Sequence, residues 1–108
     1  MNGYKRSDEP CSIESTNGIV TFTPCRSSFL VEFGNVAMRF SREELQEFIE
    51  FLDHVELPLP IDGGGPEDRT VVIESTRFGV ILLFTVHEFA ELYELLVETQ
   101  IDAVLHGL

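Results

Sequence analysis

One stretch of the sequence occurs twice, and this repetition limits what the chain can fold into. Residues 36–52 read VAMRFSREELQEFIEFL, and residues 80–96 read VILLFTVHEFAELYELL. A shift of 44 positions aligns apolar, hydroxyl and acidic residues of the two copies. In each copy, alternating apolar residues precede a hydroxyl residue and an acidic amphipathic pattern, which predicts a strand, a helix cap and a helix. The sequence therefore predicts an α+β domain with a tandem repeat.

Each predicted helix begins with a capping box. Ser41 is followed three residues later by Glu44, and Thr85 is followed in the same way by Glu88. Apolar residues then recur at i, i+3, i+4 and i+7, which gives each helix one face for the core. These stripes are Leu45, Phe48, Ile49 and Leu52 in the first copy, and Phe89, Leu92, Tyr93 and Leu96 in the second.

Turn residues between alternating apolar runs predict the strands. Asn17-Gly18 favours a tight hairpin at the front of the chain, with Ile13 pairing near Val20 or Phe22. A second hairpin is predicted over residues 29–40. We therefore expect two ββα units with an extra N-terminal hairpin. They would share one antiparallel sheet of five or six strands about a pseudo-twofold axis, with both helices on one face.

The distribution of polar, glycine and proline residues along the chain predicts one domain. Residues 1–10 are polar and read as a flexible tail, while residues 11–108 form the domain. Within it we expect a first ββα unit at 28–57 and a second at 69–106. Three glycines and three prolines mark 58–68 as the linker between them.

The charge of the chain limits its partners. It carries 19 acidic and 7 basic residues, a formal net charge of −12, which disfavours binding to nucleic acids and to anionic membranes. Lys5 is its single lysine, a composition typical of proteins from a salty cytoplasm. No apolar leader or long apolar run occurs, so we expect a cytoplasmic protein in which Cys11 and Cys25 are reduced.

The face of the predicted sheet that points away from the helices is also apolar, so something should cover it. The residues that we place at this contact surface are Leu30, Ala37, Ile81 and Leu83. The first hypothesis is therefore a non-enzymatic module for protein interaction or self-association, either as a homodimer or with an unknown protein partner.

The second hypothesis is a domain that binds a metal ion or another small ligand. Its candidate residues are Cys11, Cys25 and His54, with the two cysteines in or near the front hairpin. Two thiols alone do not complete a zinc site, which normally has four ligands. Residues 87–91 resemble the H-E-x-x-H zinc motif, but Glu91 stands at the second histidine and Glu88 is already a capping residue.

Catalytic signatures are absent from the sequence, and no cofactor is implied. The acidic residues of the second helix share one face at spacings of three and four, which is typical of a solvated surface. These residues are Glu91, Glu94, Glu98 and Asp102. The glycine-rich DGGGP stretch lacks the residues of a phosphate loop, and no nucleophile–base pattern occurs. An enzyme is the third hypothesis.

The stretches FGNVAMRFSREELQEF and TVVIESTRFGVILLFTVHEFAELYELLVE resemble a family of small uncharacterised proteins of Bacteroidetes-type bacteria with a domain of unknown function. The resemblance covers the chain from about Gly18 onward and rests on apolar, structural motifs. In that family a C-x-x-C often precedes the F-G-N strand. Cys25 matches the first cysteine here and Ser28 stands at the second, which weakens a metal or redox role. The resemblance implies no known activity.

Overall fold

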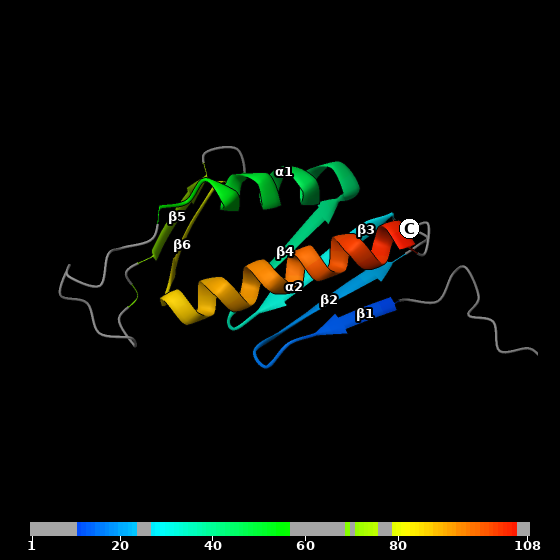
Figure 1. Cartoon of the computed structure of the whole chain (residues 1–108), viewed down its shortest axis with the longest axis horizontal. Helices are drawn as coiled ribbons and strands as arrows, with labels where there is room; N and C mark the ends of the chain where they lie inside the picture. Colours follow the sequence, from blue (N-terminus) through cyan, green and yellow to red (C-terminus); the bar gives the residue numbers. More distant parts are fainter. Residues whose placement is uncertain (1–10, 24–26, 57–68, 70, 76–78, 106–108) are drawn as a thin grey trace, which may run out of the picture.

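A computed structural model describes residues 11–23, 27–56, 69, 71–75 and 79–105 (Figure 1). The predicted tail, the whole predicted linker and Cys25 lie outside the described residues. The elements in chain order are β1 (Cys11–Glu14), β2 (Gly18–Thr23), β3 (Ser28–Phe33), β4 (Val36–Ser41), α1 (Arg42–Asp53), β5 (Val71–Ser75), β6 (Val80–Phe84) and α2 (Val86–Leu105). The predicted α+β class is confirmed.

Strands β1 to β4 form an antiparallel meander in which each strand pairs with the next along the chain. Ile13 pairs with Val20, and Val20 pairs with Val31, so the predicted front hairpin and its register are confirmed. The β3–β4 turn includes Gly34 at a φ of 58°, a left-handed conformation that glycine adopts without steric cost. Consecutive pairing therefore builds one four-stranded sheet from local connections.

The single shared sheet that the repeat predicts is wrong, because β5 and β6 form a separate two-stranded sheet. Figure 1 shows this hairpin at one end of the molecule, running across the direction of β1–β4. One of its faces is buried on the core, where Phe84 meets Phe33 edge-on with 5.7 Å between the ring centroids. A strand in which apolar and polar residues alternate must bury its apolar face. Packing that face against the core buries it, and no hydrogen bonds to the four-stranded sheet are required.

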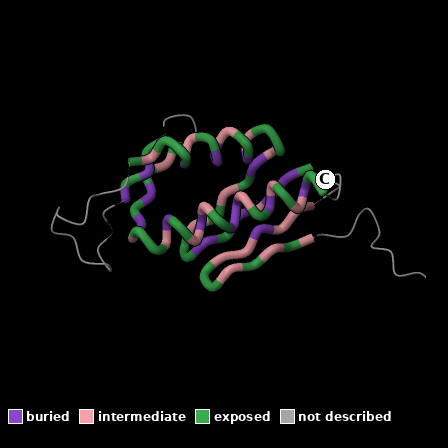
Figure 2. The backbone as a smooth tube through the Cα atoms, in the orientation of Figure 1, coloured by how far each residue is buried: buried purple, intermediate pink, exposed green. Residues whose placement is uncertain are grey.

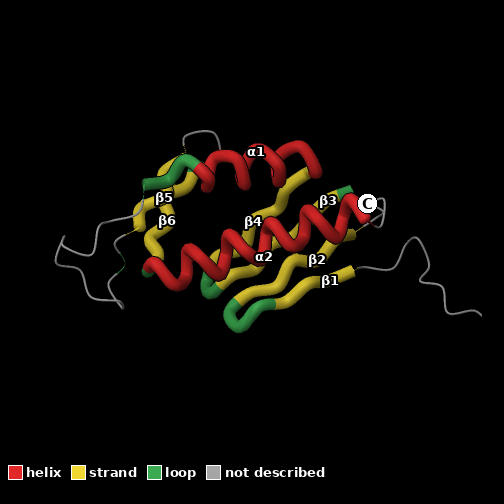
Figure 3. Tube along the Cα trace, viewed as in Figure 1, coloured by secondary structure: helices red, strands yellow, loops and turns green. Residues whose placement is uncertain are grey.

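Both helices cover the same face of the four-stranded sheet, as predicted (Figure 3). Helix α1 packs against β3 and β4, whereas α2 packs against β1 and β2, and the two helices contact each other. The Glu44 N–H donates to Ser41 Oγ at 3.1 Å, and the Ser41 N–H donates to the Glu44 carboxylate at 2.8 Å. Helix α1 ends at Asp53.

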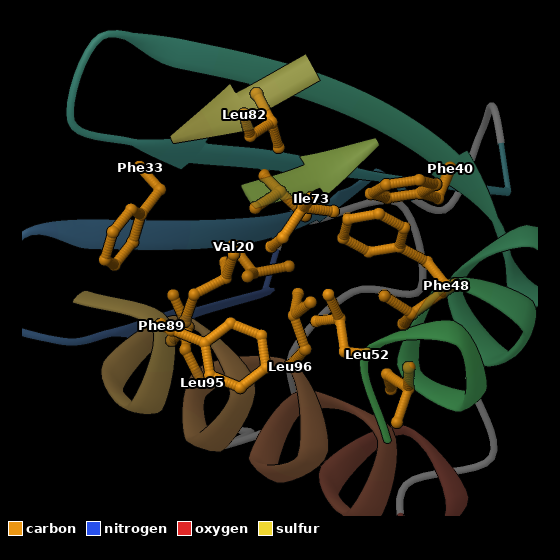
Figure 4. Packing of buried hydrophobic residues seen from close by; sticks show 14 of the residues in the cluster. Val20, Phe33, Phe40, Phe48, Leu52, Ile73, Leu82, Phe89, Leu95 and Leu96 are labelled. Carbon is orange, nitrogen blue, oxygen red and sulfur yellow. The ribbon is translucent and has the colours of Figure 1, made fainter. Parts of the chain in front are cut away.

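The core lies between the four-stranded sheet, the two helices and the inner face of the β5–β6 hairpin (Figures 2 and 4). Phe40 and Phe48 stack with 5.0 Å between their ring centroids. Every predicted stripe residue is buried except Tyr93, which is half-buried. The order strand–strand–helix occurs twice, but only the first hairpin belongs to the four-stranded sheet. The symmetry expected between the two units stays a prediction.

Candidate functional site

The outer face of the β5–β6 hairpin carries exposed apolar residues. Val71 and Ile73 alternate with Val72, and Leu82 separates Ile81 from Leu83, so one set points into the core and the other points outward. Val72, Ile81 and Leu83 are between 51% and 64% exposed. Val72 and Leu83 are cross-strand partners, and Ile81 is diagonal to Val72, so the three form one patch. We call these three residues the hairpin patch.

Charged residues of opposite sign border the hairpin patch. Glu74 is exposed and is the cross-strand partner of Ile81. At the other end, Arg69 Nη1 donates to the Leu83 carbonyl at 3.3 Å and to the Glu88 carboxylate at 3.0 Å. An arginine has five donors, so these contacts leave Arg69 able to bind a further carboxylate. The hairpin patch therefore has a carboxylate at one end and, at the other, an arginine that is paired with Glu88 and keeps free donors.

The structure places the four predicted contact residues on two different sheets. Ile81 and Leu83 belong to the hairpin patch. Leu30 and Ala37 point away from the helices on the four-stranded sheet, where Leu30 is half-buried and Ala37 is exposed. Leu30 has Arg39 as its partner on β4, and Ala37 has Glu32 on β3. The single apolar face that we expected is thus divided, and its part on the larger sheet is mixed in polarity.

A second apolar surface lies near the end of α2. Ile101, Val104 and Leu105 are between 56% and 75% exposed, although a soluble helix normally has polar residues outside. Val97, four residues before Ile101, is half-buried against the core. We call these four residues the helix patch. It continues the apolar sector of α2 beyond the part that the sheet covers.

The candidate metal ligands are not brought together among the described residues. Cys11 is a thiol at the start of β1, and His54 follows the end of α1, and these two segments lie at opposite ends of the molecule (Figure 1). His54 Nδ1 lies 2.8 Å from the Glu50 carbonyl oxygen. Within the described ranges, no three His, Cys, Asp or Glu side chains form a group that could hold a metal ion.

A small cavity lies beside Cys11. Its volume is about 10 Å³, which is room for about one water molecule. The lining comes from the first three strands and from α2, and consists of Cys11, Ile13, Val20, Phe22, Phe29, Thr99 and Asp102. The Thr99 hydroxyl donates to the Leu95 carbonyl, as helical threonines commonly do. The cavity is too small for a cofactor or an organic substrate.

The sequence predicted that Glu91 lies on a solvated acidic face of α2. The structure shows instead that Glu91 is hydrogen-bonded to the front hairpin. Its carboxylate accepts hydrogen bonds from Ser15 Oγ at 2.5 Å and from the Asn17 N–H at 2.6 Å. Partial burial alone would raise the pKa of the Glu91 carboxyl, but the hydrogen bonds from Ser15 and Asn17 outweigh it and lower that pKa below its ordinary value. Nothing in the spacing of the α2 glutamates distinguishes Glu91 from Glu94 or Glu98.

The fold and these surfaces define a small α+β domain with two uncovered apolar patches. The chain belongs to a family of unknown function, DUF6686, whose model matches residues 11–106. The resemblance to a domain of unknown function is thereby confirmed. The chain matches no curated protein and no solved structure. Among the described residues, no helix is both long enough and apolar enough to cross a membrane.

Proposed function

We propose that this domain is a non-enzymatic self-association module, in which two copies pack their hairpin patches against each other. The observation that carries the proposal is the exposure of Val72, Ile81 and Leu83 on one face of a hairpin whose other face is in the core. Side chains of this size normally gain about 1.5–3 kcal/mol each from full burial. A second copy supplies a surface of the same chemistry.

The charges around the hairpin patch favour a second copy as the occupant. Consider two hairpins packed face to face about a twofold axis perpendicular to their strands. The axis reverses strand direction, so Glu74 of one copy lies over the end that carries Arg69 in the other. Each contact then joins opposite charges, and symmetry makes it twice. The border charges therefore support an isologous dimer.

The small size of the hairpin patch supports a reversible dimer. A standard interface buries about 800 Å² on each partner, and three half-exposed side chains supply only its centre. The net charge of −12 on each copy opposes association. Salt screens that repulsion, so the dimer should strengthen as ionic strength rises. The same acidic composition, with a single lysine, supports our further proposal of a salty cytoplasm as the working environment.

Sedimentation velocity of the full chain over a concentration series, at low and high potassium chloride, tests the proposal. We expect a monomer–dimer equilibrium that shifts to dimer with salt, and a loss of dimer in Ile81→Glu. Ala37→Glu is the matched control, because it adds the same charge on the outer face of the other sheet. A monomer throughout, or a dimer sensitive to Ala37→Glu and not to Ile81→Glu, would overturn the assignment.

A further inference from the structure

We propose that the helix patch of α2 is a separate docking site for a basic amphipathic helix of another protein. The proposal goes beyond self-association, because it concerns a different element and a different kind of partner. It rests on the spacing of the exposed apolar residues, on their position along α2 and on the charge of the surrounding surface.

The spacing of the helix patch suits a helical partner. Val97, Ile101, Val104 and Leu105 recur at i, i+4, i+7 and i+8, the pattern by which one helix packs along another. The same side of α2 continues towards its start through Tyr93 and the exposed Ala90. Tyr93 and Val97 are half-buried against the core, so the exposed part of this stripe lies in the last turns of α2. Helix-in-groove recognition uses anchors at this spacing.

The charge around the helix patch selects a basic partner. Glu94 and Glu98 are exposed, and α2 contains no lysine or arginine. The neighbouring α1 carries a single arginine, Arg42, and is otherwise rich in exposed carboxylates, among them Glu43 and Glu50. A partner helix with lysine or arginine beside its apolar stripe would meet carboxylates on α2 and on the neighbouring α1.

A second copy of this chain does not satisfy the same surface. Pairing α2 with α2 would bring Glu94 and Glu98 of both copies together with no basic residue of α2 to offset them. The hairpin patch differs, because Arg69 and Glu74 give it both signs. The two surfaces are therefore assigned to different occupants, a second copy for one and a basic helix for the other.

A labelled peptide of leucine and lysine in an amphipathic helical pattern serves as the probe. It should be about 18 residues long, which is five helical turns. We expect its fluorescence anisotropy to rise on titration with the full chain, and its affinity to fall as salt rises. Ile101→Glu should weaken binding by about tenfold or more, which corresponds to about 1.4 kcal/mol, because it places a carboxylate in the apolar contact.

Ile81→Glu is the matched control, since it makes the same substitution in the hairpin patch. It should leave peptide binding unchanged while removing the dimer, and Ile101→Glu should do the reverse. Both side chains are more than half exposed, so both variants should fold, which circular dichroism checks.

Three outcomes of the peptide titration would overturn the proposal. These are no binding of the lysine peptide, equal binding by Ile101→Glu, or equal binding of a peptide with glutamate in place of lysine. Association with vesicles containing phosphatidylserine that depends on Ile101 would also overturn it, since it would identify a lipid surface as the occupant. If the chain bound the lysine peptide but formed no dimer, the docking site would be supported and only the proposed self-association would be wrong.

Discussion

The carboxylate of Glu91 accepts hydrogen bonds from both the backbone N–H and the side-chain amide of Asn17, at 2.6 Å and 2.8 Å. Asn17 lies in the turn between β1 and β2, and its carbonyl accepts from the N–H of Gly34, in the β3–β4 turn, at 3.0 Å. One side chain of α2 therefore fixes the front hairpin against the helix, across 74 positions of sequence.

Replacing Glu91 with glutamine should destabilise the domain by about 1 kcal/mol, the typical contribution of a hydrogen bond to folding. The amide of glutamine keeps one acceptor oxygen, but its NH₂ group would face the NH₂ group of Asn17. Urea unfolding measures the change. Glu94→Gln is the matched control, because it removes the same charge from an exposed position of α2. Equal effects of the two substitutions would contradict the prediction.

The lowered pKa of Glu91 predicts how the stability depends on pH. A carboxyl whose pKa is lower in the folded state contributes stability above its unfolded pKa, and loses it as the pH falls through the folded pKa. The free energy of unfolding should therefore fall more steeply on acidification in the wild type than in Glu91→Gln. Parallel curves below pH 5 would show that the hydrogen bonds to Glu91 contribute nothing.

A close contact at Gly18 predicts that Gly18→Ala will be strongly destabilising. A β-carbon there would lie 2.6 Å from Phe33 Cδ1 and 3.0 Å from the Glu32 carbonyl oxygen, both closer than van der Waals contact allows. Forced packing of this kind typically costs about 1–3 kcal/mol. Thermal unfolding followed by circular dichroism measures the loss.

Substitutions at Gly34 serve as a comparison, because they test the effect of backbone conformation on stability without a steric clash. Its φ is 58°, but a β-carbon there meets nothing within 4 Å. Gly34→Ala should therefore cost only about 1 kcal/mol for the left-handed backbone, and Gly34→Asn should cost less, because asparagine adopts that region more readily. If Gly18→Ala were as mild as Gly34→Asn, the contact with Phe33 would not be a constraint on the fold.

Local rules predicted the elements of this fold well. The hairpins at Asn17-Gly18 and at Gly34 and the two capping boxes depend on residues close in sequence, whose chemistry has one common solution. The arrangement of the β5–β6 hairpin was not predictable in this way. The alternation of apolar and polar residues in β5 and β6 requires only that one face be buried. It does not specify whether the hairpin pairs with the edge of the first sheet or forms a separate sheet packed against the core.

The surfaces were predictable only in part. Ile81 and Leu83 were identified because they alternate with residues that point into the core. This alternation depends only on neighbouring residues of one strand, so it can be predicted from the sequence. Their separation from Leu30 and Ala37 follows from the division into two sheets, which the sequence did not reveal. The role of Glu91 depends on a turn at the other end of the chain. Spacing within α2 carries no information about such a contact.

Substitutions of Thr85, the N-cap residue of α2, should change stability only when they remove its hydroxyl group. The Glu88 N–H donates to Thr85 Oγ1 at 3.0 Å, and the Thr85 N–H donates to the Glu88 carboxylate at 2.8 Å. Thr85→Ala should cost about 1 kcal/mol, as is typical when an N-cap is lost. Thr85→Ser keeps the hydroxyl and should retain most of the stability. Chemical denaturation of both variants makes the comparison.

Tyr93 predicts a loss of stability in alkaline solution. Its hydroxyl donates to the Asp53 carboxylate, and this hydrogen bond, with smaller effects of burial and of the Asp53 charge, raises the pKa of Tyr93 above its ordinary value. A raised pKa contributes stability below the unfolded pKa, and that stability disappears as the pH rises through the folded pKa. Tyr93→Phe should remove this dependence. Absorbance titration of the phenolate, with Tyr93→Phe as its reference, measures the shift directly.

The position of α2 at the end of the described chain has a consequence for synthesis on the ribosome. The meander β1–β4 can pair as soon as it emerges, because each of its strands needs only its neighbour in sequence. Its inner face, with Val20 and Phe33, is buried only in the presence of the leucines of α2, such as Leu95 and Leu96. The nascent chain therefore exposes an apolar sheet until Val86–Leu105 has been made, and during this interval it needs protection from aggregation.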